Sequence, residues 1–127
     1  MKKEFLVLAY SKHSNWYYGK EISSDEMSVL EMFLAEDYGL YKYSRLIKWA
    51  EDPSFHYRHA NITFLRKELG NMIIGDLYDK ESSIRKFSLP IKKFIKLLND
   101  WEDVGIKYPK EIVITKKGDN IIVEGKN

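Results

Sequence analysis

The sequence contains no cysteine in its 127 residues, which excludes disulfide bonds, catalytic thiolates and cysteine-ligated zinc. Small secreted domains often carry disulfides, so this absence favours a reducing compartment. Glycine is scarce too: the seven glycines are scattered rather than clustered. A phosphate-binding loop needs clustered glycines, because side chains would block the close approach of the backbone. The P-loop, the dinucleotide-binding motif and the serine-hydrolase motif Gly-x-Ser-x-Gly are all absent.

Long apolar runs are missing as well. The apolar run at residues 5–10 follows two lysines but is only six residues long. A signal peptide needs roughly seven to fifteen apolar residues and a cleavage site, and a membrane span needs about twenty. We therefore interpret the run as a first β-strand, and we expect a cytoplasmic protein that does not enter a membrane.

The length and composition are those of one globular domain. With 44% hydrophobic and 31% charged residues, the chain is long enough to bury one continuous core. No repeat, low-complexity tract or flexible linker divides it. We therefore expect a single domain that covers residues 1–127, and the motif search indicates no cofactor.

Hydrophobic periodicity predicts a mixed order of strands and helices. Expected helices are a stretch of about a dozen residues after Ser23 or Ser24, residues 41–51, and a stretch that begins at Pro90 and ends before Gly105. Segment 54–60 is expected to be a loop. Local hairpins require antiparallel pairing, so we predict an α+β fold with about three helices packed on an antiparallel sheet. Expected strands cover residues 4–10, 16–22, 61–68, 71–78, 83–88, 111–115 and 120–124.

Charge is segregated along the chain, although the net charge is only +2. Residues 21–40 carry six acidic residues and no lysine or arginine. Residues 41–67 carry six basic and two acidic residues, and residues 84–99 carry five basic residues and no acidic one. Blocks of one sign steer charged partners even when the total charge is small, although solvated helix faces produce the same pattern.

The acid-only segment also contains aromatic residues, and we take it as the candidate partner-binding face. Tyrosine and tryptophan supply large contact areas at interfaces, and acidic residues around them suit a basic partner. The alternative is that most of the nine tyrosines and three tryptophans fill the core. The candidate residues are Glu21, Asp25, Glu26, Glu31, Glu36, Asp37, Tyr38 and Tyr41.

Histidine offers a second kind of chemistry. His56 and His59 face one metal ion only if their segment is helical, with His13 or Asp52 as a third ligand, yet the segment is expected to be a loop. Exposed or locally hydrogen-bonded imidazoles explain them as well. A histidine-dependent nuclease would need His13 to meet His56 or His59 in space, which a sequence does not show. We therefore expect no metal site and no enzymatic activity.

Nucleic-acid binding is a further alternative. Trp16, Tyr17 and Tyr18 lie between Lys12 and Lys20, and single strands are bound by stacking aromatics with flanking basic residues. However, aromatic residues in a strand more often serve packing, and the RNA-recognition motif is absent. A pI near 8.6 does not by itself give a basic face. The sequence therefore favours a protein partner over a nucleic acid.

The C-terminal third contains a strand that ends at residues 87–90 (Phe-Ser-Leu-Pro), a helix with residues 100–102 (Asp-Trp-Glu) at its end, and a terminal hairpin after Pro109. This arrangement resembles small immunity proteins of bacterial polymorphic-toxin and contact-dependent growth-inhibition systems. The resemblance implies a protein that neutralises a cognate toxin domain by direct binding, and many such toxins are nucleases with basic clefts. It transfers no binding residues, because each immunity protein fits its own toxin, and it leaves the oligomeric state open.

Overall fold

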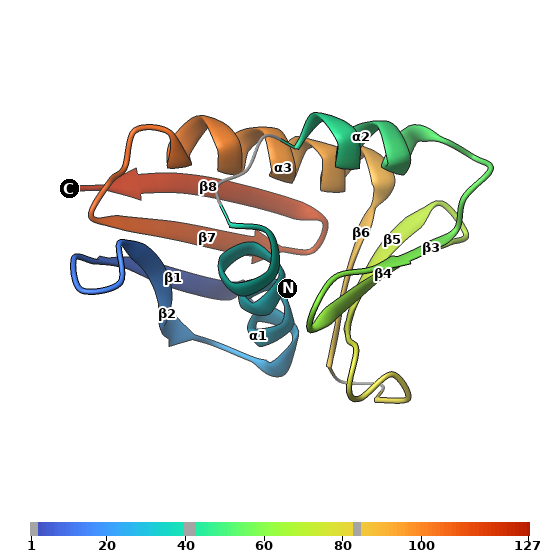
Figure 1. Ribbon diagram of the computed structural model, residues 1–127, viewed down its shortest axis with the longest axis horizontal. Coiled ribbons are helices and arrows are strands. Elements are labelled where there is room, and N and C mark those ends of the chain that lie inside the picture. Colours follow the sequence, from blue (N-terminus) through green and yellow to red (C-terminus); the bar gives the residue numbers. More distant parts are fainter. Residues whose placement is uncertain (1–2, 40–42, 83–84) are drawn as a thin grey trace.

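The computed structural model describes residues 3–39, 43–82 and 85–127. Two antiparallel four-stranded sheets lie on either side of the helical segment 25–38 (Figure 1). The first sheet has the strand order β2-β1-β7-β8, and the second has the order β3-β4-β5-β6. The strands are β1 Lys3–Ser11, β2 Trp16–Ile22, β3 Tyr57–His59, β4 Thr63–Glu68, β5 Asn71–Asp76, β6 Lys86–Pro90, β7 Glu111–Lys117 and β8 Asn120–Lys126.

The helices are α1 Asp25–Glu31, the π-helix η1 Met32–Tyr38, α2 Ser44–Glu51 and α3 Ile91–Gly105. Ser24 caps the N-terminus of α1: its Oγ accepts a hydrogen bond from the Met27 N–H at 3.2 Å. Acidic residues fill its first turn, where the helix dipole favours negative charge. Helix α1 contacts strands of both sheets, and α3 packs across β8 and β6 (Figure 1).

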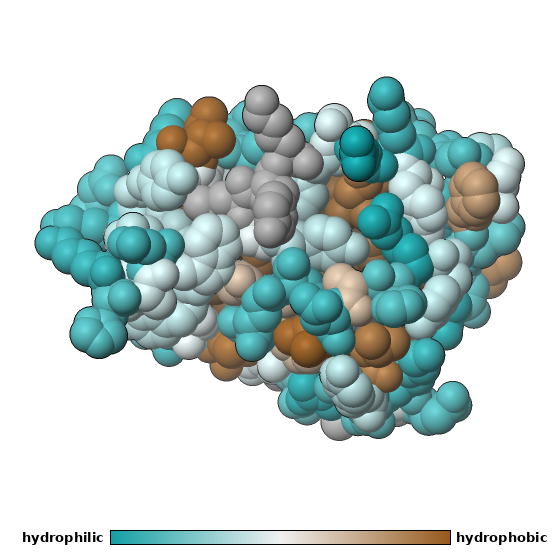
Figure 2. Space-filling model, viewed as in Figure 1, coloured by the Kyte–Doolittle hydropathy of each residue, from teal (hydrophilic) through white to brown (hydrophobic). Residues whose placement is uncertain are grey.

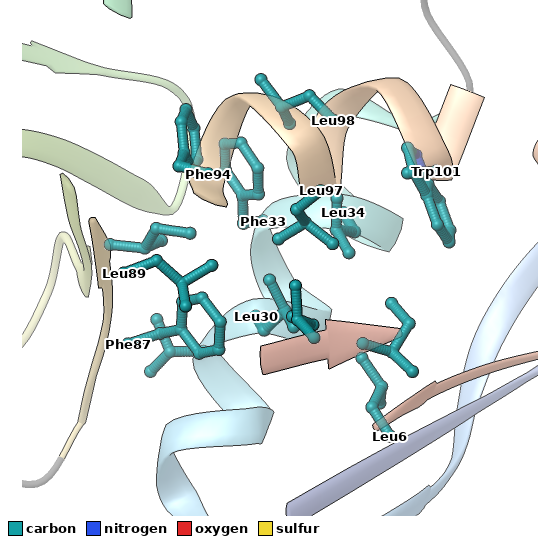
Figure 3. Packing of buried hydrophobic residues seen from close by; sticks show 14 of the residues in the cluster. Leu6, Leu30, Phe33, Leu34, Phe87, Leu89, Phe94, Leu97, Leu98 and Trp101 are labelled. Atoms are coloured by element: carbon teal, nitrogen blue, oxygen red, sulfur yellow. The ribbon is translucent and has the colours of Figure 1, made fainter. Parts of the chain in front are cut away.

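One apolar core joins both sheets to the helices (Figure 3). Each fully buried leucine or phenylalanine in it contributes about 1.5–3 kcal/mol relative to exposure. The cluster contains residues from both sheets and from the helices that contact them, so both sheets bury their inner faces in one core. The side chains labelled in Figure 3 are Leu6, Leu30, Phe33, Leu34, Phe87, Leu89, Phe94, Leu97, Leu98 and Trp101.

The predicted α+β class with antiparallel pairing is confirmed, and β2 has the predicted bounds. The strands form two sheets rather than the single sheet expected, because the alternation within a strand does not specify its partner. Segment 54–60 contains the short strand β3, which pairs with β4. Three residues are too few to show a period, so the prediction of a loop was wrong there. Residues 83 and 84 of the next expected strand lie outside the described residues.

The helix predicted after Ser24 changes type halfway along. Its first part, α1, is α-helical, and its second part, η1, is a π-helix that ends at Tyr38, directly before Gly39. A π-helix closes i→i+5 hydrogen bonds, is rare, and occurs frequently at functional sites. Of the helix predicted at residues 41–51, residues 41 and 42 lie outside the described ranges, and α2 begins at Ser44.

Helix α3 begins directly after Pro90, as predicted, and includes Gly105 as its last residue. The terminal hairpin is confirmed, although β7 extends to Lys117 and so shortens the turn to residues 118–119. Within the described parts of the chain, no helix combines the length and apolar character needed to cross a membrane.

Gly39, directly after η1, contacts side chains from three other parts of the chain through its backbone. Its φ of 64° and ψ of −146° lie in a region that is essentially limited to glycine. A Cβ at this position would lie 2.3 Å from Cζ2 of Trp16. Its carbonyl oxygen accepts hydrogen bonds from Nε1–H of Trp101 at 2.9 Å and from the Tyr43 hydroxyl. Its N–H donates to the carbonyl of Leu34 at 2.8 Å.

Replacing Gly39 with alanine is expected to lower the free energy of unfolding by about 2–4 kcal/mol, because the methyl group clashes with Trp16 and the backbone becomes strained. Gly70, in the β4–β5 turn, has a φ of 80° and open space around it, so it is a matched control. Gly70→Ala should lower the free energy of unfolding by about 1–2 kcal/mol, through backbone strain alone. Urea denaturation followed by tryptophan fluorescence measures both losses. Equal losses would show that the Trp16 contact contributes nothing.

Candidate partner-binding site

A cleft of about 640 Å³ opens where the end of η1 meets the start of β2 and the segment that follows α3. Three aromatic rings and two carboxyl groups line it, and its lining within the described residues contains no basic side chain. Pockets that combine apolar walls with a few polar groups are the usual form of a binding site. The lining consists of Trp16, Ala35, Glu36, Asp37, Tyr38, Gly39 and Tyr108.

Trp16 forms one fixed wall of this cleft. Its indole Nε1–H donates to the carbonyl oxygen of Ala35 at 2.5 Å, and its ring lies against the Cα of Gly39. The glycine therefore permits the close approach of the tryptophan to η1. A ring held on both sides in this way loses little further conformational entropy when a partner contacts it.

Tyr108 also lines the cleft, and it carries backbone strain. Its φ is 49°, and its side chain is 64% exposed. A bulky residue in the left-handed region is an outlier that costs on the order of 1–3 kcal/mol, and such outliers cluster at functional sites. The ring packs edge-on against Tyr10, with 6.5 Å between centroids. The chain thus accepts strain at a position that presents an aromatic ring to solvent.

Asp37 lines the cleft, but its carboxylate stabilises the fold. Its carboxylate accepts hydrogen bonds from the backbone N–H groups of Ile62 and Thr63 and from the Thr63 hydroxyl. These contacts attach η1 to the start of β4. Hydrogen bonds to a charged group contribute about 1.5–3 kcal/mol each to stability. Changing Asp37 would therefore disturb folding before it revealed anything about binding.

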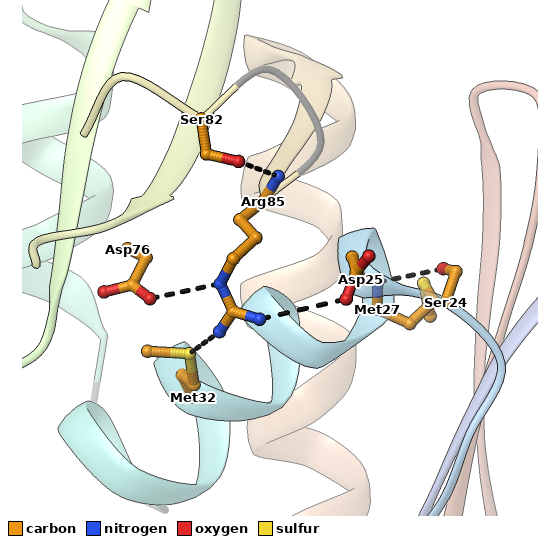
Figure 4. A network of polar contacts seen from close by, with 7 residues as sticks. All are labelled: Ser24, Asp25, Met27, Met32, Asp76, Ser82 and Arg85. Carbon is orange, nitrogen blue, oxygen red and sulfur yellow. Dashed lines mark hydrogen bonds and ion pairs between the residues drawn. The ribbon is translucent and has the colours of Figure 1, made fainter. Parts of the chain in front are cut away.

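Asp25 and Glu26 are both engaged in ion pairs. Asp25 lies 3.8 Å from Nη1 of Arg85, whose Nε is also 3.2 Å from Asp76 (Figure 4). Glu26 lies 3.1 Å from Nζ of Lys116 on β7. The two pairs connect the first turn of α1 to both sheets, and the negative charge there is compensated locally.

Glu21 is exposed on the opposite face of the first sheet. It pairs with Val7, which alternates along β1 with the fully buried Leu6 and Leu8. Directly paired residues point to the same side of a sheet, so Glu21 points away from the core and the helices. It therefore lies apart from the cleft, although it belongs to the same run of acidic residues.

Tyr38, the last residue of η1, is half-buried. Its ring centroid lies 4.7 Å from that of Phe33 and 6.3 Å from that of Tyr43. Burial raises the pKa of Tyr38, while the hydrogen-bonded guanidinium of Arg58 opposes this rise. Tyr41, the last candidate, lies outside the described residues.

Glu31 and Glu36 form a hydrogen-bonded carboxyl pair beside the cleft. Glu31 packs over β2, where a Cβ on Gly19 would lie 3.0 Å from its Cγ. Burial raises the pKa of Glu31 to about 7, and the hydrogen bond and negative charge of Glu36 add to the rise. Glu36 is exposed and lines the cleft. Near neutral pH the pair therefore binds a proton for part of the time.

The acid-only segment is thus not one uniform acidic face. The structure brings Glu36, Asp37 and Tyr38 together at the cleft, with Glu31 behind Glu36, and places Asp25, Glu26 and Glu21 elsewhere. On the face shown in Figure 2, hydrophilic side chains stand over the region of α1 and η1, with apolar atoms visible between them.

A second hollow of about 490 Å³ has the opposite charge. Three lysines line it, Lys12, Lys110 and Lys126, together with one acidic residue, Glu111. Glu111 is itself paired with Lys20 at 2.7 Å. The molecule therefore presents an acidic cleft and a basic hollow as separate features.

The histidines do not converge on one place. His13 lies in the turn between β1 and β2, whereas His59 is in β3 and His56 directly precedes it. Figure 1 shows that turn and β3 at opposite ends of the molecule. Among residues 3–39, 43–82 and 85–127, no three His, Asp or Glu side chains are grouped as a metal site requires.

The aromatic triplet in β2 does not form one stacking surface. Tyr17 is 3% exposed and donates its hydroxyl to the carbonyl of Pro109, whereas Tyr18 is 50% exposed on the other side of the strand. Trp16 turns toward η1. The three rings therefore face different surroundings.

Comparison of the chain with protein-family models, with curated proteins and with solved structures found no match. The function must therefore be argued from the cleft itself. Sequence reasoning did not single out Tyr108, because neither its strained backbone nor its proximity to η1 has a sequence signal. A helix that ends three residues before it gives no indication that the ring lines a cleft.

Stability should depend on pH through Glu31. Its pKa is about 7 in the folded protein and ordinarily 4.5, so between these values the folded state holds a proton that the unfolded chain has lost. Stability should therefore fall as pH rises through this window and level off above it. Glu31→Gln, which stays neutral, should be more stable than the wild type at about pH 8, and this advantage should shrink toward pH 5. Urea unfolding across the window measures it.

Glu36→Gln is the matched control for this pH dependence. Removing the neighbouring charge should bring the pKa of Glu31 closer to its ordinary value and so move the stability change to lower pH. If the wild type and Glu31→Gln have the same pH profile, Glu31 does not titrate in this window.

Proposed function

We propose that this protein binds a partner protein through the aromatic and acidic cleft, and that it neutralises a bacterial toxin domain in this way, as an immunity protein does. The observation that carries the proposal is the cleft itself: the half-buried rings of Trp16 and Tyr38 and the exposed ring of Tyr108 line it together with an exposed carboxylate, Glu36. Tryptophan and tyrosine dominate the residues on which protein interfaces depend.

The charge of the cleft favours a basic partner. Its lining within the described residues combines two acidic side chains with no basic one. A nuclease needs a basic surface to hold phosphate groups. An acidic protein surface placed on it would block access of the nucleic acid, and complementary charge would speed the encounter. This makes a nuclease-type toxin the partner that we favour.

The rigidity of the cleft also favours tight binding. Trp16 is held by a hydrogen bond to η1, and Asp37 attaches the same helix to β4. A preorganised surface loses less entropy on association than a flexible one, so more of the contact energy appears as affinity.

Reversing the charge of Glu36 should weaken protection against the toxin. Glu36→Lys is expected to slow association about tenfold or more, because a complementary charge becomes a repulsive one. Glu21→Lys makes the same change on the outer face of the first sheet and should leave protection intact. The measurement is survival of cells that co-express each variant with the C-terminal domain of a toxin encoded beside the gene for this protein, where the proposal expects the cognate toxin to be encoded. Equal protection by both variants would show that the cleft is not the binding surface.

Tyr108→Gly separates binding from folding. Glycine relieves the left-handed strain, so the free energy of unfolding should stay within about 1 kcal/mol of the wild type or increase. Loss of the exposed ring should nevertheless weaken toxin binding about tenfold or more. Urea denaturation and surface-based affinity measurements give the two values. A variant that binds as tightly as the wild type would remove Tyr108 from the interface.

A further inference from the structure

The cleft has the features of a site for a flat cation. We propose that it takes the guanidinium group of an arginine side chain from the partner protein, and that this group displaces the proton held between Glu31 and Glu36. The source of the arginine rests on the proposed function, whereas the site itself is a property of this chain.

The π-helix creates the carboxyl pair. Glu31 is the last residue of α1 and Glu36 lies within η1, five positions later. Residues five apart lie about 140° from each other around an α-helix of 3.6 residues per turn. The wider i→i+5 turn of a π-helix brings them to one side of the helix, and here the two carboxyl groups are hydrogen-bonded. The local change of helix type therefore has a direct chemical consequence beside the cleft.

The walls of the cleft suit a planar cation better than a compact one. Trp16 and Tyr108 present aromatic rings, and cations are attracted to the faces of such rings. A guanidinium group stacks on aromatic rings and also donates hydrogen bonds in a fork that matches carboxylate oxygens, whereas an ammonium group is a hydrated point charge. The combination of flat rings and carboxyl oxygens thus favours arginine over lysine.

The negative charge of Glu31 and Glu36 is available to a bound cation. The pKa of Glu31 is set by its burial and by Glu36, and no cation of the described residues contributes to it. Asp37 is turned to the backbone of β4, and Lys20 of β2 is paired with Glu111. On the side of β2 the pair faces Gly19. A bound guanidinium would stabilise the doubly charged pair and so release its proton.

An arginine probe tests this directly on the full chain. N-acetyl-arginine methylamide, titrated to millimolar concentration, should shift the indole N–H resonance of Trp16 in NMR spectra. The neutral isostere N-acetyl-citrulline methylamide should not shift it. Trp49, which does not line the cleft, serves as an internal reference. Because a proton must leave a group with a pKa of about 7, the apparent affinity should be about tenfold weaker at pH 6 than at pH 8.

Three variants complete the test. Glu36→Gln should weaken binding of the arginine probe, and Glu31→Gln should remove the pH dependence of binding, whereas Glu21→Gln should change neither. The inference is overturned if the citrulline probe shifts Trp16 equally, if wild-type affinity does not depend on pH, or if Glu36→Gln binds arginine as the wild type does.

The outcomes separate this inference from the proposed function. If the arginine probe binds as expected but no variant affects protection in cells, the guanidinium site stands and the toxin role fails. If Glu36→Lys abolishes protection but the arginine probe does not bind, the toxin role stands and the guanidinium site fails.

Discussion

The carbonyl oxygen of Gly39 accepts hydrogen bonds from two side chains, and the position of the cleft depends on them. Trp101 of α3 and Tyr43, next to α2, both donate to it, while Trp16 occupies the space that a side chain at this position would fill. Each hydrogen bond contributes only about 1 kcal/mol, but a buried donor left without a partner costs more. The end of η1 is therefore fixed against three elements, and the cleft forms where they meet.

Three departures from regular structure lie at or beside this point. The helix becomes a π-helix, Gly39 adopts a conformation that other residues avoid, and Tyr108 accepts a left-handed backbone. Each of these conformations raises the free energy of the folded chain relative to regular structure. The surrounding packing must therefore hold them in place. Proteins commonly depart from local preferences where binding or catalysis requires a particular geometry. The coincidence of three departures with one cleft is the physical reason for placing the function there.

The acidic residues of the segment 21–40 have different structural roles. Asp25 and Glu26 form ion pairs between α1 and the sheets, Asp37 accepts backbone hydrogen bonds, and Glu31 and Glu36 form a hydrogen-bonded pair beside the cleft. Sequence spacing does not distinguish these roles, because they depend on which neighbour lies within about 4 Å. An uninterrupted acidic run therefore indicates only where negative charge is available.

The sequence by itself determined the α+β class, the hairpins, and most helix and strand positions, because hydrophobic periodicity, capping residues and turns act over a few residues. Its acidic and aromatic composition also predicted a partner-binding role for Glu36 and Tyr38, which both line the cleft. The tertiary structure alone decided that the strands form two sheets, that the helix after Ser24 changes type, and that Trp16 and Tyr108 line the same cleft. These features arise from contacts between residues far apart in the chain, whose pairing no local pattern encodes.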